Sequence, residues 1–318
     1  TNIGLDLMLF NSRYGLTIDY YNKITRDLLN SVQLPSSLGY TTTIQNIGKI
    51  KNYGLEIALD AKIVDNAFQW NVSPNIAFNR NVVLALNKGE DIIGSSFYNG
   101  IITDFINIVQ EGEPLGIFYG YKETGYDENG KITYEDVDGN GLSFADKRKI
   151  GDPNPNFTYG LNSSMSYKRF DLDIFFQGTY GNDIYNFASM AMTQDYGYGL
   201  NAPRDLLNNN WTPENPNAKY PRLSRTNAVR ISDRFVEDGS FLRLKNIQLG
   251  YRIDLNKWGW ANRAKIYVSG QNLLTWTGYS WFDPEINYAG GANSINQGID
   301  YYTYPVVKSV TMGIKLDF

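Results

Sequence analysis

The chain has 318 residues, contains neither cysteine nor histidine, and carries a formal net charge of −4 with a sequence pI of about 5.1. The missing residue types exclude disulfides, Ser-His-Asp or Cys-His nucleophiles and His-ligated zinc. An acidic chain without a basic stripe also argues against nucleic-acid binding. Hydrophobic residues make up 42% of the chain, too many for a disordered protein, but no apolar run approaches the roughly 20 residues of a membrane helix. Because the first residue is Thr1, we expect a mature or truncated piece of a longer protein.

Apolar and polar residues alternate with a period of two along much of the chain, which predicts antiparallel β-strands. We expect about ten strands. The clearest runs are residues 3–11, 15–24, 53–63, 68–79, 157–168, 170–177, 241–253, 264–276 and 310–318. Pro74 lies inside one run and requires a bulge or a missing ladder bond there. The period slips around Lys245–Asn246, as a β-bulge requires.

The connections between these strands are of two kinds. Short turns are expected at 64–67, 168–169 and 256–263, and long segments at 30–40, 84–113, 124–156, 183–239 and 277–305. Tight turns that alternate with long loops are typical of outer-membrane β-barrels. The alternative, a soluble β-sandwich, would have more even loops and two apolar faces packed on each other. In the barrel interpretation, the apolar face of the last strand, 310–318, faces lipid.

Five stretches resemble the C-terminal half of the SusC/RagA-like TonB-dependent outer-membrane transporters. They are DYYNKITRDLL (19–29), QNIGKIKNYGLEIAL (45–59), IGDPNPNFTYGLNSSMSYKRFDLDIFFQGTYGNDIYN (150–186), FLRLKNIQLGY (241–251) and VSGQNLLTWTGYSWFDPE (268–285). They occur in the family's order and cover nearly the whole chain. The run GDPNPNFTYG followed by FFQGTYGNDIYN is specific to the SusC-like branch.

The resemblance implies an all-β fold, a 22-stranded transmembrane antiparallel β-barrel occluded by an N-terminal plug. It also implies import of oligosaccharides or oligopeptides across the outer membrane of a Gram-negative, Bacteroidetes-type cell. TonB energises such import, usually under a SusD-like surface lipoprotein that forms a lid. Nothing in residues 1–318 resembles a plug or a TonB box. We therefore expect this chain to supply the C-terminal strands of a larger barrel.

The stretch DVDGNGLSFADKRKIGDP (136–153) begins like an EF-hand-type calcium loop, with oxygen ligands at alternate positions followed by Gly141. The expected ligands are Asp136, Asp138, Asn140, the Leu142 carbonyl and Asp146. The pattern departs from the motif at its twelfth position, where Lys147 replaces the usual Glu. Asp146 could serve if the loop is one residue short. The alternative is a solvated turn without metal, because Asp, Asn and Gly favour turns by themselves. No other cofactor is implied.

Aromatic residues cluster in the long connections, and we expect some of them to contact substrate. The candidates are Tyr185, Tyr196, Tyr198, Trp211, Trp281 and Tyr288. The alternative role is packing within the loops or contact with the membrane interface. Carboxylates on the polar strand faces, such as Asp171 and Asp173, are expected to line the barrel wall rather than form a catalytic pair. Glu285, in the FDPE run, is expected to have a structural role at the rim.

Three functions are consistent with these features. The leading hypothesis is the barrel portion of a nutrient importer, with no catalytic residue and with lipid, TonB, a lid lipoprotein and a glycan or peptide as partners. The second is a surface binding or adhesion barrel that does not transport. The third is a soluble carbohydrate-binding β-protein, which would be extracted without detergent.

Overall fold

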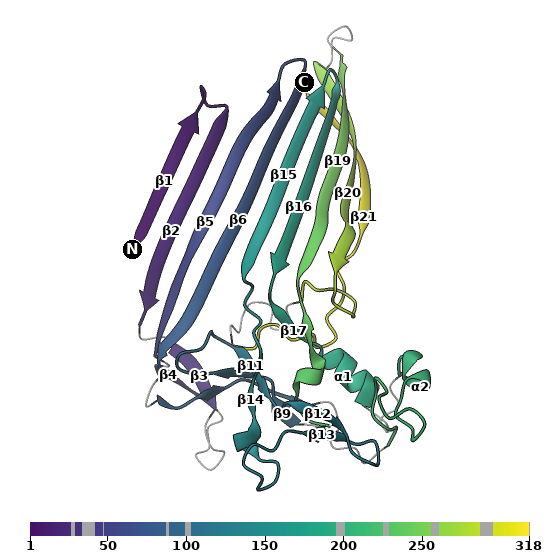
Figure 1. Cartoon of the computed structure of the whole chain (residues 1–318). Coiled ribbons are helices and arrows are strands. Elements are labelled where there is room, and N and C mark those ends of the chain that lie inside the picture. Colours follow the sequence, from purple (N-terminus) through teal and green to yellow (C-terminus); the bar gives the residue numbers. More distant parts are fainter. Residues whose placement is uncertain are drawn as a thin grey trace.

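The computed structural model describes residues 1–26, 29–33, 42–46, 48–86, 89–98, 103–194, 201–224, 229–255, 261–286 and 295–317. Within these residues, nine long strands form one antiparallel sheet in the order of the sequence (Figure 1). They are β1 (Asn2–Leu9), β2 (Tyr14–Thr25), β5 (Lys49–Asp65), β6 (Phe68–Ala85), β15 (Phe157–Tyr167), β16 (Phe170–Tyr180), β19 (Phe241–Asp254), β20 (Arg263–Thr277) and β21 (Ser309–Asp317). The sequence predicts about ten strands, and the nine clearest runs correspond to these nine.

Side chains of one kind form rows across the sheet because neighbouring strands are in register. Leu5 of β1 lies opposite Ile18, Ile18 opposite Ile57, and Ile57 opposite Ile76 of β6. The rows between carry polar residues, since successive side chains of a strand point to opposite faces. Period-two alternation in the sequence therefore produces one apolar face and one polar face over the whole sheet.

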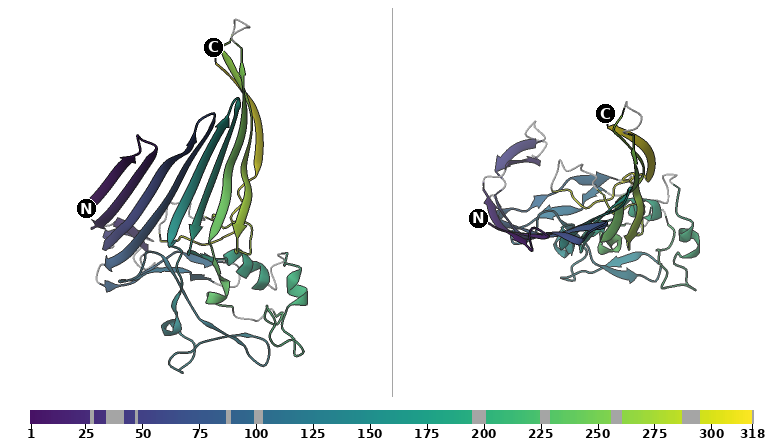
Figure 2. Two further views of the ribbon diagram at one scale, coloured as in Figure 1. Left: turned by 45° about the horizontal axis from the view of Figure 1, so that its top comes forward. Right: turned by 90° about the horizontal axis from the view of Figure 1, so that it is seen from above.

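The apolar face is exposed. On β21, Val310, Met312 and Ile314 have 69%, 75% and 69% of their surface accessible. Apolar area of this extent is rare on water-soluble proteins, whereas barrel strands present such a face to lipid. Such exposure does not fit a soluble sandwich, in which two apolar faces pack on each other. Seen from above, the sheet curves like part of a barrel wall, with β1 and β21 at its two free edges (Figure 2).

Both irregularities expected from the sequence are present. The ladder between β5 and β6 has partners at Ala58–Asn75 and again at Ala61–Val72, and Pro74 lies in the gap, where its missing N–H leaves no ladder bond. In β19, Leu244 and Asn246 pair with consecutive residues of β16, so Lys245 is the extra residue of a β-bulge.

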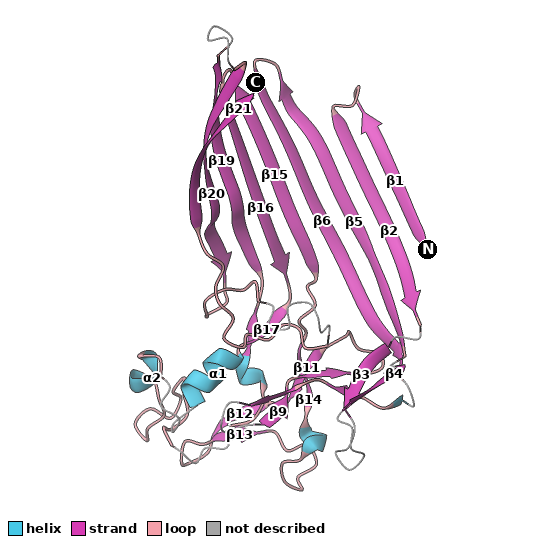
Figure 3. Ribbon diagram, turned by 180° about the vertical axis from the view of Figure 1, so that it is seen from behind, coloured by secondary structure: helices cyan, strands magenta, loops and turns pink. Residues whose placement is uncertain are grey.

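Short and long connections leave the sheet at opposite ends. Four short turns, at 10–13, 66–67, 168–169 and 255–262, join the strands at one end. The long connections, 26–48, 86–156, 181–240 and 278–308, gather at the other end, where Figure 3 shows the helices and small strands. We call the described residues of these four connections the loop region.

The loop region contains short elements of its own. They are β3 (Leu29–Gln33), β4 (Thr42–Asn46), β7 (Ile92–Ile93), β8 (Ser96–Tyr98), β9 (Thr103–Phe105), β10 (Asn107–Val109), β11 (Ile117–Gly120), β12 (Glu123–Tyr126), β13 (Ile132–Tyr134), the 3₁₀ turn η3 (Phe144–Asp146), β14 (Arg148–Gly151), β17 (Asp183–Tyr185), α1 (Phe187–Gln194), α2 (Asp205–Asn208), η4 (Asp233–Phe235) and β18 (Val236–Asp238). None of the helices in the described ranges is long and apolar enough to span a membrane.

One expectation about the connections is wrong. The sequence separates 84–113 from 124–156, as though a barrel strand lay between them. That segment instead contains β11, which has only four residues and pairs with β10 and β14 in a small separate sheet. Ile117 and Phe118 of β11 are fully buried in the loop region, so residues 86–156 form a single connection.

Candidate functional site

The loop region has a hydrophobic core of its own, built from three connections that are far apart in the sequence. Phe118 comes from the first of these connections, Tyr185 and Ile231 from the second, and Ile299 from the third. All four have no exposed surface. The complete cluster is Phe97, Ile106, Phe118, Tyr185, Phe187, Met190, Val229, Ile231, Phe235 and Ile299. These three long connections are therefore packed together as one folded unit at the mouth of the barrel wall.

Two of the aromatic candidates are buried within the loop region, and Tyr185 belongs to this cluster. Tyr185 is fully buried, its hydroxyl lies 3.4 Å from the Met190 sulfur, and burial raises its pKa well above the ordinary value. Trp211 is 8% exposed and packs over Gly130, where an added Cβ would lie only 2.4 Å from the indole ring. Neither side chain presents a broad surface to a substrate in this conformation.

The remaining aromatic candidates differ in how they can be placed. Trp281 is partly exposed and makes an edge contact with Phe282, whose ring is 67% exposed. Tyr196, Tyr198 and Tyr288 lie outside the described residues. The substrate-binding role of the candidates stays a prediction, and Trp281 is the described candidate with the most accessible ring.

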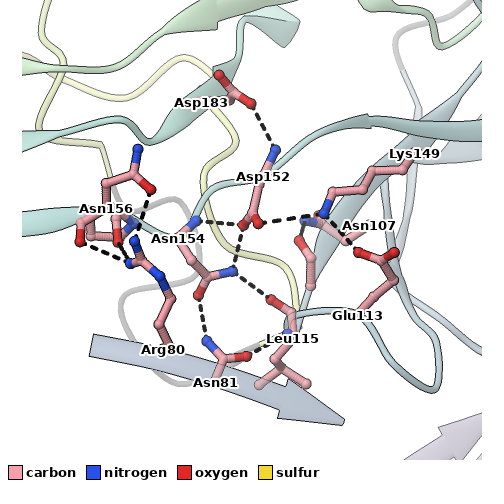
Figure 4. A network of polar contacts seen from close by, with 12 residues as sticks. Arg80, Asn81, Asn107, Glu113, Leu115, Lys149, Asp152, Asn154, Asn156 and Asp183 are labelled. Carbon is pink, nitrogen blue, oxygen red and sulfur yellow. Dashed lines mark hydrogen bonds and ion pairs between the residues drawn. The ribbon is translucent and has the colours of Figure 1, made fainter. Parts of the chain in front are cut away.

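The family-specific run GDPNPN joins the loop region to the barrel wall (Figure 4). Asn154 is at the centre: its amide nitrogen donates to the Leu115 carbonyl (3.1 Å) and to Asp152 (2.8 Å), and its oxygen accepts from Asn81 of β6 (2.9 Å). The Asp152 N–H in turn donates to Asp183 at the start of β17 (2.8 Å). Burial raises the pKa of that Asp183 carboxyl. The motif thus connects β6, the segment just before β11, and β17 through hydrogen bonds.

A second polar cluster lies at the rim and contains the FDPE run. Arg243 of β19 is 2% exposed and donates to Asp283 (2.5 Å) and to Glu285 (2.9 Å). Lys245, the bulged residue, adds a contact to Glu285 at 2.7 Å. Asp283 also accepts from the Val306 N–H (3.1 Å), so it joins both ends of the last connection. The structure supports the structural role expected for Glu285.

Three of the five residues expected in the possible calcium loop lie close together. Carboxylate oxygens of Asp136, Asp138 and Asp146 lie within 4.8 Å of one another. Asp146 accepts backbone hydrogen bonds from Ser143 (2.7 Å) and Val137 (2.8 Å), which hold the pKa of its carboxyl below the usual range. Three hard oxygen donors in one small loop fit the preferences of calcium.

The structure also explains why Lys147 occupies the twelfth position of the loop. Its ammonium group contacts Asp104 at 2.8 Å and lies 4.3 Å from the centre of the Phe105 ring. The side chain is directed into the loop-region core, where it is 4% exposed. Lys147 therefore fastens this loop to β9, and Asp146 is the described carboxylate that joins Asp136 and Asp138.

The carboxylates of the polar sheet face have partners within the wall. Asp171 contacts Lys265 at 2.5 Å across β19, passing over Gly250, whose missing Cβ leaves room for both side chains. Asp173 accepts from Ser164 at 2.6 Å. These contacts within the wall support the expectation that Asp171 and Asp173 are wall residues.

Comparison with known proteins gives the family. No family model matches the chain. TonB-dependent receptor P3 of Formosa agariphila is 37% identical over 342 residues, covering 100% of this chain and 34% of the relative. TonB-dependent receptor SusC of Bacteroides thetaiotaomicron is 32% identical, with 100% and 31% covered. The solved RagAB peptide transporter matches with a TM-score of 0.82 and 27% identity over 100% of this chain and 34% of that chain.

A curved sheet with a lipid-facing side and long loops at one end defines a portion of an outer-membrane β-barrel. The chain belongs to the TonB-dependent receptor family, on the SusC/RagA side of it. It spans about a third of the length of the curated relatives that it matches. Those relatives are named as receptors and transporters, which agrees with the expectation of no catalytic role.

Proposed function

We propose that this chain is the C-terminal barrel portion of an importer that takes up oligopeptides or oligosaccharides through the outer membrane of a Bacteroidetes-type cell. The observation that carries the proposal is the two-faced sheet with a folded loop region at one end. The apolar face suits lipid, the polar face suits a hydrated lumen, and the loop region covers the mouth. The partial match to a solved peptide transporter favours peptides as the first substrates to test.

In this proposal the energy for transport comes from TonB, which acts through a part of the protein outside this chain. A SusD-like lipoprotein covers the loop region from outside. The residues of this chain then bind and orient substrate rather than transform it. Trp281 is the best-placed described candidate because it is partly exposed and stands two residues before Asp283 in the chain. Co-purification of a surface lipoprotein with the tagged full-length receptor tests the partnership.

Uptake by whole cells tests the function. The gene for the full-length receptor is deleted, and energy-dependent uptake of labelled oligopeptide and oligosaccharide pools is measured with and without a protonophore. We expect one pool to lose uptake in the deletion strain, to regain it with the restored gene, and to lose it again with the protonophore. Surface binding that is unaffected by the protonophore would instead support the non-transporting surface barrel.

We further propose that calcium binds at Asp136, Asp138 and Asp146, with Asn140 and the Leu142 carbonyl completing the oxygen ligands. The ion would order this outer loop without chemistry of its own. Calorimetric titration of the full-length receptor with calcium should show a heat of binding, and the Asp136→Asn variant should not show it. Glu128→Gln, a nearby exposed carboxylate change, is the matched control and should retain it. Equal binding by both variants would contradict the site.

A further inference from the structure

Residues 295–300, which we call the key segment, lie beside β17 in the core of the loop region. Tyr185 donates its N–H to the Gly298 carbonyl (2.9 Å), and the Asp300 N–H donates to the Tyr185 carbonyl (3.0 Å). A third bond runs from the Ala188 N–H to the Asp300 carbonyl (3.0 Å). Ile299, between them, is completely buried. The last long connection is thus paired by its backbone with the connection between β16 and β19.

The same segment is also bound to the connection between β6 and β15. The Asn296 amide exchanges two hydrogen bonds with Ser95, at 2.6 and 2.9 Å. Gln297 donates to the Leu115 carbonyl at 2.9 Å. Gly298 has a φ of +74°, and a Cβ there would lie 2.4 Å from Pro153. Only a glycine fits at this close approach.

Within its own connection, the key segment is tied to the residues that follow β20. The Tyr279 hydroxyl donates to Asp300 (2.7 Å), which is 1% exposed. Burial is the main cause that raises the pKa of Tyr279 far above its ordinary value, and the Asp300 carboxylate is the second. The hydroxyl therefore keeps its proton and acts as a donor. Asp300 also accepts from the Thr303 N–H (3.0 Å). The segment is therefore held from three directions at once.

We propose that the key segment joins these three long connections into one cooperative unit, so that they open together and none of them acts as a separate lid. Removing any one of them would expose the apolar surfaces of the other two and leave their backbone groups without partners. Elements that share a core in this way open as a unit in native-state exchange. If the protein is the importer proposed above, on which this point rests, access to the lumen then cannot depend on the movement of a single loop.

Hydrogen exchange of the full-length receptor in detergent, read by mass spectrometry, tests this without requiring transport. The variant Ile299→Ala removes buried atoms from the key segment, and Ile93→Ala, at a side chain that is 52% exposed, is the matched control. Loss of a buried Ile side chain should speed exchange by about 30-fold or more. We expect that acceleration in peptides covering 105–109, 184–190 and 297–300 together, and no comparable change in the control.

Acceleration confined to 297–300 would overturn the inference, because it would show that this segment opens by itself. The reciprocal variant Ile231→Ala, in the connection between β16 and β19, should speed exchange at 297–300 as well. Leu207→Ala, in the same connection at a residue that is 71% exposed, should not. If the alanine variants are not recovered in the membrane, Ile299→Val removes one methylene and should give an acceleration of about 2- to 10-fold with the same pattern. A receptor that shows the shared pattern but imports neither substrate pool would contradict the proposed function alone.

Discussion

The buried ion pair at the rim allows a quantitative test. Asp283→Asn removes the negative charge that faces Arg243, whose side chain is 2% exposed, while Asp283 itself is 8% exposed. Breaking a buried pair by removing one partner costs about 3–5 kcal/mol. Glu285 remains on the other guanidinium nitrogen at 2.9 Å and is 35% exposed. Because Arg243 therefore keeps one carboxylate, we expect the lower end, about 3 kcal/mol.

The matched control is a solvated ion pair between Asp254, the last residue of the same strand, and the turn that precedes β16. Arg169 and Asp254 approach to 3.5 Å, with 55% and 60% of their side chains exposed. Such a pair contributes about 0–1 kcal/mol, so Asp254→Asn should have little effect. The assay is denaturant-induced unfolding of the full-length receptor in lipid vesicles, comparing the two variants with the wild type. Losses of less than about 1 kcal/mol in both variants would refute the reasoning, since they would show that Arg243 is hydrated in spite of its burial.

Three more predictions follow from other parts of the structure. Met312→Arg, on the lipid face of β21, should destabilise the folded barrel by about 2–4 kcal/mol if it lies near the membrane midplane. Thr311→Arg, on the polar face, should not. The folding yield of the two variants in lipid vesicles is compared. Burial raises the pKa of Tyr134 to about 12, so the unfolded chain releases this proton at lower pH than the folded chain, and the free energy of unfolding should fall between pH 10 and 12. Tyr134→Phe should lessen that loss in unfolding curves measured at alkaline pH. Identical curves for the variant and the wild type would contradict the raised pKa of Tyr134. Gly130→Ala places a Cβ 2.4 Å from the Trp211 ring at a φ of +74°, whereas Gly112→Ala, at a φ of +85°, meets nothing within 4 Å; thermal unfolding should show an additional loss of about 1–3 kcal/mol for Gly130→Ala alone.

The barrel wall could be predicted from the sequence because its determinants are local. The alternation of Val310, Met312 and Ile314 fixes which face of β21 is apolar without reference to the rest of the chain. Pro74 and the slip at Lys245 are likewise readable from a few neighbouring residues, and the structure confirms both.

The loop region could not be predicted in the same way, because its contacts are non-local and follow no period. The residue type of Tyr185 and its place in a long connection make it a candidate substrate contact. Its burial depends on Phe118 and Ile299, which lie far from it in the sequence. The same holds for Lys147, whose partner Asp104 lies 43 residues away. Gly298 and Gly130 allow close approaches in this packing, but a glycine in the sequence does not by itself show what it packs against.

The central claim is that the sheet is a membrane wall with one face toward lipid. The chain lacks cysteine, so single cysteines introduced at successive positions from 309 to 316 in the full-length receptor can each carry a spin label in lipid vesicles. The account predicts that collisions with oxygen, which concentrates in lipid, peak at 310, 312 and 314, and that collisions with a water-soluble nickel complex peak at the alternate positions. Equal access of the nickel complex to both sets would contradict it, because the apolar face would then be in water.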